Sequence, residues 1–452
     1  MQDILAYIET HKERFLQELC DYLAKPSIST QGVGVEECAR YIRAHMDGLG
    51  IATQLLPTAG YPVVYGELRN PDARRTLLIY GHYDVQPPEP LDEWVSPPFE
   101  PTLRDGRLYA RGAGDNKGQH FAHLKAIEAW LHVRKRVPIN LKIILEGEEE
   151  SGSRNLPAFV AEHKALLQAD GVFSADGPMH ESWRPMVFLG LRGIVTLELR
   201  ARGANRDFHS GNRGGVVPNA AWDLVHALAS MKDRNGRVLI EGFYDNVRPP
   251  SAAEEAALAE IPFDPPRVLE EWGLKQFAPP LDVGYHHKLM FQPTFNINGF
   301  ASGYDGVGVK TVIPHKGTVK MDIRLVPDQD PEDILDKVRR HLRRHGFDNI
   351  AVAPHGFCYH PSRTAVDLPF VQTIVKAVGL GFGQQPVVYP SIGGSAPDFL
   401  FTRELGLPSV WTAYAPPDEN NHAPNENTTP EIFFSGIRST ATVLEELARM
   451  EG

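Results

Sequence analysis

The stretch LEGEEESGS, residues 145–153, places four carboxylates within five positions directly after the apolar run VPINLKIIL of residues 137–145. That run is rich in branched side chains and contains a proline near its start, which is typical of a buried strand in a mostly parallel sheet. The acidic residues therefore follow the C-terminal end of a strand, where ligands and catalytic groups collect in open α/β sheets. A solvated acidic loop is the more common interpretation of such a run, so the rest of the sequence has to decide.

Helical and strand-like patterns alternate along the first part of the chain, which indicates an α/β domain with a largely parallel sheet. A proline-rich segment at 85–101 interrupts them and predicts an ordered surface loop. The pair Asp105-Gly106 predicts the turn of a short hairpin. The expected helices lie near 2–24, 36–49 and 116–135, and the expected strands near 62–68, 76–81 and 137–145.

The pattern changes after GLRG at 190–193. Strand and helix then recur in two rough halves, as in a ferredoxin-like α+β layer, with an irregular insertion at about 243–290, and α/β alternation returns from about 366. Strands are expected at 194–203, 292–299, 318–326, 349–356, 386–390 and 408–414, and helices at 219–232, 331–346, 397–405 and from 430.

A chain of 452 residues exceeds one ordinary core, so two domains are expected. The patterns predict a catalytic α/β domain with a mostly parallel sheet, split into 1–191 and 385–452, around an inserted α+β domain at 192–384.

The charge balance favours a small-molecule or peptide ligand. Net charge is −11 with dispersed basic residues, which argues against nucleic acid or an anionic membrane as the main partner. The first twenty residues have helical spacing broken by charges, so we expect neither a signal peptide nor a membrane span. Cys20, Cys38 and Cys358 form no CxxC pair, which predicts no disulfide framework and a cytoplasmic location.

Candidate metal ligands stand at the ends of other predicted strands. In LLIYGHYDVQP an apolar strand ends at His82 and Asp84, although a buried, hydrogen-bonded histidine is the more common interpretation of an isolated pair. In ARGAGDNKGQ, Asp115 precedes a predicted helix, so it caps that helix, binds a ligand or does both. A nucleotide site is the alternative for this glycine-rich turn, but neither GxGxxG nor GxxxxGK[ST] is present.

Asp176 follows another short apolar strand, and His422 lies in a polar loop after SVWTAY. Each is unremarkable alone, since turns favour such residues. Together with His82, Asp115 and one glutamate of the acidic run they would share one sheet edge, and two imidazoles with three carboxylates suit two zinc-like ions that share a carboxylate. The remaining glutamate would take a proton from water.

Nine motifs, taken in order along the chain, resemble those of the carnosinase-like metallodipeptidases of the aminoacylase and carboxypeptidase group, metallopeptidase family twenty. The motifs are GHYDVQP, GAGDNKG, EGEEESGS, GLRG, FHSG, KTVIP, IRLVP, GGSAPDF and HAPNE, and they extend over nearly the whole chain. The resemblance implies a di-metal catalytic domain, two Zn²⁺ per subunit (with Mn²⁺ or Co²⁺ as alternatives), and a homodimer formed through the inserted domain, which would act as a lid.

The resemblance also implies a role for each ligand position. His82 and Asp176 would bind one metal, Glu150 and His422 the other, and Asp115 would bridge them.

Three positions would be catalytic. Asp84 would orient the ring of the first histidine, Glu149 would be the general base, and His209 of the lid would reach the partner subunit's site and stabilise the oxyanion. Glu148 stands where relatives often have an uncharged residue, and the segment 177–188 is only loosely similar.

Three further positions would hold the carboxylate end of the substrate: Arg324, Thr311 and Ser395. Independently, the turn at 393–395 before a predicted helix is typical of an anion site.

The sequence therefore predicts a cytoplasmic di-zinc metallopeptidase that hydrolyses dipeptides. An amidohydrolase that acts on N-acyl amino acids with the same site is the alternative. A non-catalytic metal-binding or peptide-binding protein is a third possibility, but an unliganded Glu149 would have no use there.

Overall fold

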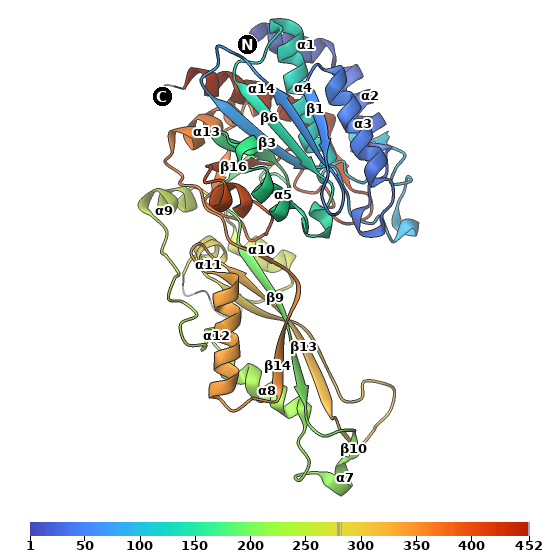
Figure 1. Ribbon diagram of the computed structural model, residues 1–452, viewed down its shortest axis with the longest axis vertical. Helices are drawn as coiled ribbons and strands as arrows, with labels where there is room; N and C mark the ends of the chain where they lie inside the picture. The colour runs from blue at the N-terminus through green and yellow to red at the C-terminus, as the bar shows by residue number, and fades with distance from the viewer. Residues whose placement is uncertain (278–280, 282, 451–452) are drawn as a thin grey trace.

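The computed structural model describes residues 1–277, 281 and 283–450. The chain forms a larger α/β region that holds both termini and an elongated inserted region that projects from it (Figure 1).

An eight-stranded sheet forms the centre of the larger region. In chain order its strands are β1 (Ala52–Leu56), β2 (Val63–Leu68), β3 (Thr76–His82), β6 (Asn140–Glu146), β7 (Gly171–Ala175), β8 (Met186–Phe188), β15 (Val387–Tyr389) and β16 (Ser409–Thr412). Their spatial order is β1–β2–β6–β3–β7–β16–β8–β15.

The sheet is mixed, so the prediction of a mostly parallel sheet applies to its centre only. β6, β3, β7 and β16 run parallel, as do β8 and β15. The pairs β1–β2, β2–β6 and β16–β8 are antiparallel. The connection from β1 to β2 is too short for the crossover that a parallel pair requires, so this edge has to be antiparallel.

Helices cover both faces of this sheet. On one face lie α1 (Gln2–Thr10), α2 (Lys12–Leu23), α3 (Val35–Gly48), α4 (Lys117–Arg134), α13 (Pro369–Phe382) and α14 (Pro430–Arg449), which share one core cluster. On the other face lie α5 (Leu156–Glu162), α6 (Lys164–Leu167) and the π-helical turn η4 (Leu400–Glu404).

Two predicted helices differ from the observed elements. The helix expected at 2–24 is divided at His11, whose φ of −109° and ψ of 16° leave the helical region. The helix expected at 397–405 is reduced to η4 and a preceding turn. There the buried Asp398 carboxylate accepts hydrogen bonds from Ser409 Oγ (2.5 Å) and Trp411 Nε1 (2.7 Å), which ties the turn to β16.

Helix α4 is buried from Lys117 to Trp130 because it lies among α1, α2, α14 and the sheet. Such a helix needs partners for its polar side chains. His120 Nε2 lies 3.0 Å from the Tyr22 hydroxyl, and His123 Nδ1 lies 2.8 Å from Thr440 Oγ1. The N-terminus of this fixed helix directly follows Asp115.

The predicted hairpin is present as β4 (Thr102–Arg104) and β5 (Arg107–Tyr109), and β17 (Asn427–Thr428) pairs with it. Asp105 and Gly106 have φ of 50° and 77°, as a tight hairpin turn requires. The segment before it holds a 3₁₀ turn, η2 (Leu91–Glu93). The small sheet brings the loop before β17 close to the start of α4.

The inserted region contains a four-stranded antiparallel sheet in the order β11–β13–β9–β14. Along the chain the elements are β9 (Gly193–Arg202), α8 (Ala220–Met231), β11 (Thr294–Ser302), β13 (Lys316–Leu325), α12 (Pro331–Arg344) and β14 (Ile350–Tyr359). This βαββαβ order is the ferredoxin-like pattern expected from the sequence. Both helices share one core with the sheet.

Shorter elements extend this region at both ends. β10 (Phe208–His209), β12 (Val312–Ile313) and α7 (Ser210–Arg213) lie at the tip remote from the larger region (Figure 1). The segment expected to be irregular contains α9 (Ala252–Ala259), α10 (Pro265–Glu271) and α11 (Tyr285–Phe291). Positions 278–280 and 282 of that segment lie outside the described residues.

The predicted domain boundary at 384 stays a prediction, and the packing of α13 favours an earlier one. It assigns α13 to the inserted domain, whereas α13 packs against α14 in the main core of the larger region. We therefore place the return of the chain between β14 and α13. The division into two domains itself stays a prediction.

Candidate metal centre

The parallel strands β6, β3 and β7 end at one edge of the sheet, and candidate ligands follow each end. His82 closes β3 opposite Glu146 of β6. The acidic run continues into a 3₁₀ turn, η3 (Glu149–Ser151), and Asp176 directly follows β7. Parallel pairing thus brings together side chains that are far apart in the sequence.

Two groups of possible ligands share Asp115. In the first, His82 Nε2 lies 3.1 Å from Asp115 Oδ1 and 3.7 Å from Asp176 Oδ2. In the second, His422 Nε2 lies 3.1 Å from Asp115 Oδ2 and 3.3 Å from Glu150 Oε2. Within each group the ligand atoms lie within 4.8 Å of one another. The two oxygens of Asp115 therefore face different groups, which is the geometry of a bridging carboxylate.

Asp84 connects the first group to the η3 turn. His82 Nδ1 lies 3.1 Å from the Asp84 carbonyl oxygen and 3.4 Å from its carboxylate. The same carboxylate accepts hydrogen bonds from the backbone N–H groups of Glu149 (3.2 Å) and Glu150 (3.1 Å). Such a contact orients an imidazole so that its other nitrogen faces a metal.

The donor set fits divalent cations. Two buried atoms, His82 Nε2 and Glu150 Oε1, have no hydrogen-bond partner among the described residues. Burial opposes protonation of His82, yet contacts with Asp115 and Asp176 raise its pKa well above the usual value. Hydrogen bonds to Asp115 and Glu150 raise the pKa of His422 to about 10. The cluster thus attracts positive charge, which bound cations would supply, and imidazole with carboxylate oxygen suits zinc.

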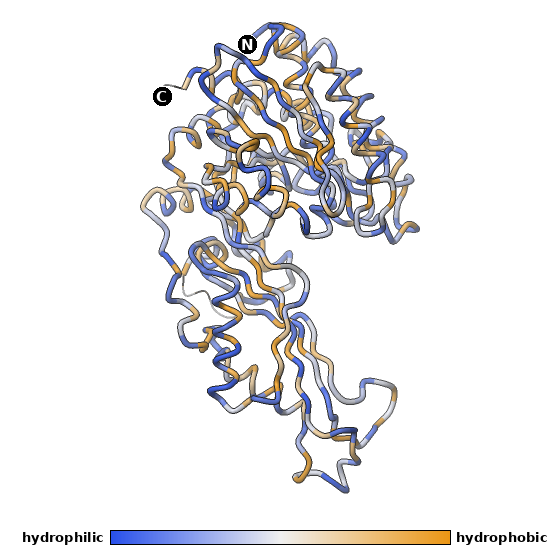
Figure 2. Tube along the Cα trace, in the orientation of Figure 1, coloured by the Kyte–Doolittle hydropathy of each residue, from blue (hydrophilic) through white to orange (hydrophobic). Residues whose placement is uncertain are grey.

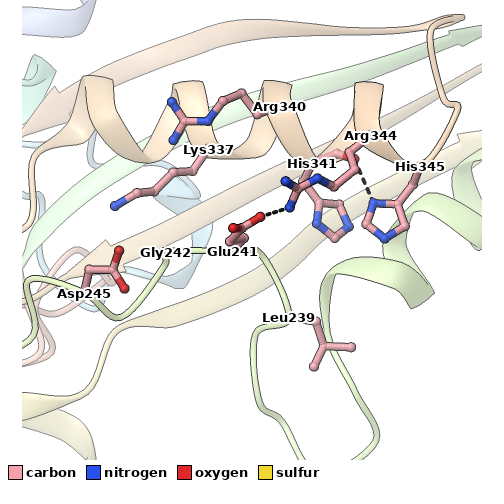
Figure 3. Close-up of a pocket in the computed structure, with 9 residues that line it drawn as sticks. All are labelled: Leu239, Glu241, Gly242, Asp245, Lys337, Arg340, His341, Arg344 and His345. Atoms are coloured by element: carbon pink, nitrogen blue, oxygen red, sulfur yellow. Dashed lines mark hydrogen bonds and ion pairs between the residues drawn. The ribbon is translucent and has the colours of Figure 1, made fainter.

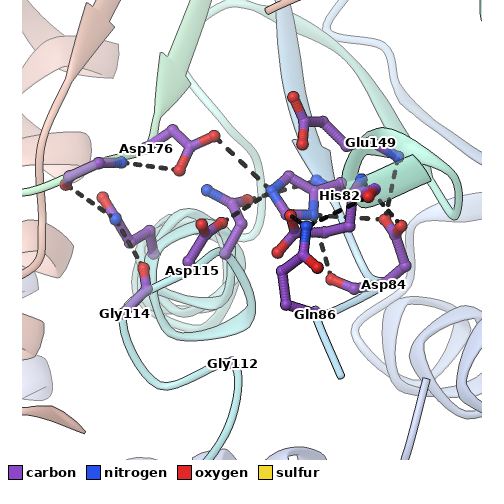
Figure 4. Close-up of polar contacts among 12 residues, drawn as sticks. His82, Asp84, Gln86, Gly112, Gly114, Asp115, Glu149 and Asp176 are labelled. Atoms are coloured by element: carbon purple, nitrogen blue, oxygen red, sulfur yellow. Dashed lines mark hydrogen bonds and ion pairs between the residues drawn. The ribbon is translucent and has the colours of Figure 1, made fainter. Parts of the chain in front are cut away.

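Glu149 belongs to neither ligand group. Figure 4 shows its side chain above the His82 ring in that view, and no dashed line reaches its carboxylate. Burial raises its pKa well above the usual value, and the neighbouring Glu150 and Asp176 carboxylates add to the shift. A carboxylate with a raised pKa beside the ligands is suited to take up a proton.

The other glutamates of the acidic run have structural contacts. Glu146 accepts hydrogen bonds from Tyr80 Oη (2.7 Å) and Ser153 Oγ (2.9 Å), and burial raises its pKa to about 8. Both oxygens of Glu148 lie 2.9 Å from Asn155 Nδ2. Glu148 is therefore held by a neighbouring loop rather than directed at the ligands.

Sequence reasoning did not single out Glu426, which fixes the loop that carries Asp115. Its carboxylate accepts hydrogen bonds from the backbone N–H groups of Gly112 (3.1 Å), Gly114 (2.8 Å) and Asp115 (2.9 Å), and from Arg111 (2.7 Å). The available signal was the acidic residue within the HAPNE motif.

Glu419 was also missed. It is buried, and neither carboxylate oxygen has a partner among the described residues. A Cβ at Gly114 would lie 1.9 Å from Glu419 Oε2, so a larger residue there would require the Glu419 side chain to move. Burial and the nearby Asp115 raise the pKa of Glu419 well above its usual value.

The other predicted residues form two separate groups. Arg324 Nη1 donates to Ser395 Oγ at 2.9 Å, where the larger and inserted regions meet. His209 Nε2 lies 3.3 Å from Thr311 Oγ1 at the remote tip (Figure 1). Within one chain, the structure therefore does not bring His209 and Thr311 to the metal centre.

No described helix has the length and apolar character needed to cross a membrane.

Comparison with known proteins gives consistent matches over the whole chain. The model of a family described as Peptidase family M20/M25/M40 matches residues 78–446. The Beta-Ala-His dipeptidase of Rattus norvegicus is 28% identical, covering 100% of this chain and 96% of that protein. The Cys-Gly metallodipeptidase DUG1 of Candida albicans is 29% identical, covering 97% and 96%. The solved structure of the M20 family metallo-carboxypeptidase Sso-CP2 from Sulfolobus solfataricus is 36% identical, covers 96% of this chain and 99% of that one, and has a TM-score of 0.88.

Proposed function

The chain belongs to peptidase family M20/M25/M40 and is a hydrolase, and we propose that it is a di-zinc dipeptidase that acts on dipeptides with a free C-terminal carboxylate. The family resemblance predicted from nine motifs is thereby confirmed. The proposal rests on the geometry of Asp115, because its two carboxylate oxygens each face a different ligand group. The names of two relatives, a Beta-Ala-His dipeptidase and a Cys-Gly metallodipeptidase, support dipeptides as the substrate class.

The first ion would be held by His82 and Asp176, the second by Glu150 and His422, and both by Asp115. When bound, the two cations would supply the positive charge that polarises the scissile carbonyl and lowers the pKa of the attacking water.

Glu149 performs the proton transfers in this proposal. Its raised pKa lets it take a proton from the attacking water and then deliver that proton to the leaving amine. Asp84 keeps the His82 ring and the backbone of η3 in one fixed arrangement, so the base stays beside the ligands.

Arg324 and Ser395 would hold the carboxylate end of the substrate. They are hydrogen-bonded to each other at the junction of the two regions. A guanidinium group with a hydroxyl beside it suits a carboxylate.

The proposed enzyme is a homodimer in which His209 and Thr311 of the partner subunit complete the site. In this arrangement the tip of the inserted region, where His209 and Thr311 lie together, would contribute to the partner subunit's site. It is supported by exposed apolar side chains on the inserted region, among them Trp222 on α8 and Ile297 and Phe300 on the edge strand β11, since unpaired edges and apolar surface favour association. His209 would stabilise the oxyanion there.

A reducing cytoplasm is the proposed location, and the three free cysteines support it.

The variant Glu149→Gln tests the chemistry. We expect it to retain two metal ions per chain by elemental analysis while kcat falls by about 10²- to 10⁴-fold. Glu148→Gln is the matched control, since that side chain is bonded to Asn155, and it should stay close to wild-type activity. A fully active Glu149→Gln enzyme would refute the assignment.

A substrate panel separates dipeptides from the alternative, N-acyl amino acids. Zinc-loaded and manganese-loaded enzyme would be assayed on Ala-X dipeptides and on the matching N-acetyl-X compounds. We expect cleavage of the dipeptides; cleavage of the acetyl compounds alone would favour the deacylase.

The role of the tip is tested by complementation. His209→Ala and Glu149→Gln should each be nearly inactive alone. Coexpressed, they should regain activity, because the mixed dimer has one site with an intact Glu149 and the partner subunit's His209. No recovery in a verified mixed dimer would contradict the shared site.

A further inference from the structure

Asn116 stands at the start of α4, directly after Asp115, and its side chain is fully buried. Asparagine at this position of a helix usually accepts a hydrogen bond from a backbone N–H of the first turn. The side chain of Asn116 makes no such bond. Its amide group therefore serves something other than the start of the helix.

The amide joins β3 and β7 where their pairing stops. The last pair of their ladder among the described residues is Tyr80 with Ser174, two residues before the ligand on each strand. Beyond that pair, Asn116 Oδ1 accepts from the His82 N–H at 3.3 Å, and Asn116 Nδ2 donates to the Ala175 carbonyl at 2.6 Å. One side chain thus supplies both the acceptor and the donor that a paired strand would otherwise provide.

The packing around Asn116 fixes the orientation of this amide. A Cβ at Gly81 would lie 3.1 Å from Asn116 Oδ1 and 2.7 Å from His120 Cβ, so the glycine permits α4 to approach β3 closely. His120 Nδ1 lies 3.1 Å from the same oxygen, and His120 Nε2 lies 3.0 Å from the Tyr22 hydroxyl. The two backbone partners determine which end of the amide is oxygen, since an N–H donates and a carbonyl accepts.

Gln119, one turn further along α4, makes similar contacts and is also fully buried. Its Nε2 donates to the Gly114 carbonyl at 2.7 Å and to the Gly177 carbonyl at 3.0 Å. Its Oε1 accepts, at 2.6 Å, from the backbone N–H two residues after β16. Gly114 directly precedes Asp115, and Gly177 directly follows Asp176. Gln119 therefore holds the backbone beside two of the ligands.

The two amides of α4 support one ligand group and not the other. Between them they contact the backbone at or beside every ligand of the first group, which comprises His82, Asp115 and Asp176. Among the described residues, neither amide contacts Glu150 or His422. The Glu150 carboxylate instead accepts from Gln86 Nε2 at 2.8 Å, and the His422 side chain is exposed. The support is thus specific to one metal position.

Polar contacts between segments also occur far from the metal centre. In a cavity of about 430 Å³ on α12, Arg344 forms an ion pair with Glu241, and His345 Nδ1 lies 2.9 Å from the His341 carbonyl oxygen (Figure 3). These contacts join α12 to its surroundings in the inserted region and involve no candidate ligand. A polar network is therefore not in itself a sign of a role at the metal centre; the backbone that it holds decides this.

Asn70 gives a closer comparison, because it is another buried asparagine with two backbone partners. Its Nδ2 donates to the Val137 carbonyl at 2.8 Å, and its Oδ1 accepts from the Asp72 N–H at 3.1 Å. It lies where β3 and β6 begin, at the opposite end of these strands from the ligands. Asn70 therefore matches Asn116 in chemistry but not in place.

We propose that Asn116, with Gln119 beside it, positions the ligands of the first metal ion, an inference that rests on the proposed di-zinc function. The carboxamide of Asn116 replaces strand pairing where β3 and β7 separate, so the spacing of the first group is set before an ion binds. Groups that orient metal ligands in this way raise the affinity for the ion. Both are positioning residues, since their contacts are with the backbone at and beside the ligands.

The first test measures zinc affinity by titrating apoenzyme with Zn²⁺ in competition with a chromophoric chelator. Wild type should bind two ions. Asn116→Leu keeps the size of the side chain without the amide, and it should weaken one ion by about 10- to 100-fold while affecting the other far less. Unchanged affinity for both ions overturns the inference and leaves the di-zinc function intact. A wild-type protein that binds no zinc refutes the di-zinc function, and the inference with it.

Ligand variants then identify the ion that Asn116 supports. Asp176→Ala damages the first group, so adding Asn116→Leu should change the remaining zinc affinity little. His422→Ala damages the second group, so adding Asn116→Leu should still lower the remaining affinity by about 10- to 100-fold. The reverse pattern would assign Asn116 to the second ion and overturn the inference.

Two further variants keep the inference testable if Asn116→Leu does not fold. Aspartate starts a helix as well as asparagine does, but its carboxylate cannot donate to the Ala175 carbonyl. Asn116→Asp should therefore weaken the first ion, and unchanged affinity would show that the residue only starts α4. Gln119→Met keeps the length of the side chain without the amide and should also weaken that ion. Full zinc affinity in both variants overturns the inference.

Asn70→Leu is the matched control, together with a spectroscopic measurement on enzyme loaded with Co²⁺. It should lower the urea midpoint of unfolding, as Asn116→Leu does, but keep wild-type zinc affinity and the wild-type visible spectrum of bound Co²⁺. Asn116→Leu should change that spectrum, because it reports the geometry of the ligands. If Asn70→Leu changes zinc affinity and the spectrum equally, lost stability explains the effect and the inference is overturned.

Discussion

Two clusters in the larger region offer the same kinds of donor atom, but protein cations neutralise only one of them. Glu18, His45 and Glu128 from α2, α3 and α4 lie as close together as the ligand groups of the metal centre. There Lys125 Nζ contacts all three: it is hydrogen-bonded to Glu18, 2.8 Å from Glu128 and 2.9 Å from His45. Arg14 also pairs with both glutamates. The protein itself supplies the cations.

At the metal centre no lysine or arginine contacts the ligand carboxylates within the described part of the chain. Asp115 faces only imidazoles, Asp176 faces His82, and Glu150 faces His422 and the Gln86 amide. A group of possible ligand atoms that lie close together is therefore not sufficient to define a metal site. A site needs donors whose charge the protein leaves unbalanced.

The largest expected effect is loss of activity in Asp115→Asn, which removes the carboxylate shared by both ligand groups. We expect kcat/KM to fall by about 10⁴-fold, since metal catalysis contributes several kcal/mol, and the metal content to fall below two per chain. Glu18→Gln in the other cluster is the control and should keep near wild-type activity. If the Asp115→Asn enzyme were active and retained two metal ions per chain, Asp115 would not be the shared metal ligand, and the proposed contrast with the Glu18 cluster would fail.

Lys125→Met breaks the other cluster. It leaves the Glu18 and Glu128 carboxylates short of one cation in a buried site, so we expect a loss of about 3–5 kcal/mol in the free energy of unfolding, measured with urea. Lys12→Met removes an exposed ion pair with Glu9 and should cost below about 1 kcal/mol. A small effect of Lys125→Met would show that its ammonium group is not the needed cation.

Chelation should affect the metal centre alone. If zinc is present at about one hundred times its Kd, its removal should lower the free energy of unfolding by about 3 kcal/mol. Re-addition of zinc should restore it. The same treatment of Asp115→Asn should have a smaller effect, and an equal effect there would locate the stabilising metal elsewhere.

The smallest expected effect is a pH dependence from His45. Burial and the neighbouring Lys125 lower the pKa of His45 to about 4, below the value of about 6.5 for an unfolded chain. Because the unfolded chain binds the proton first, stability falls as pH decreases from about 6.5 toward 4, by about 2 kcal/mol at pH 5. The difference between wild type and His45→Gln in urea unfolding at pH 7 and pH 5 isolates this contribution; no difference would contradict it.

Much of the metal centre could be predicted because its residues stand at strand ends. A period of two and a run of branched side chains place His82 and Asp176 after buried strands, and parallel strands share one edge. No pattern in the sequence predicted that Glu18, His45 and Glu128 lie together. They lie on helices, and the sequence does not show how those helices pack against one another. The same holds for Lys125, whose position alone turns that cluster into an ion-pair network.

For a related reason, the sequence patterns did not predict three features of the fold. These are the antiparallel edges of the mixed sheet, the helix break at His11 and the short helices of the 243–290 segment. Local periodicity reports burial of one face, whereas strand direction and helix ends depend on what packs beside them.

By itself the sequence determined the family and the α/β and βαββαβ element orders, and it predicted the candidate ligands, because these follow from residue spacing along one chain. Only the tertiary structure shows which acidic clusters the protein neutralises, that Glu426 holds the Asp115 loop, and that His209 lies remote from its own metal centre. These are statements about charge and distance between segments that are far apart in the sequence. Electrostatic free energy depends on separation in space, which spacing along the chain does not state.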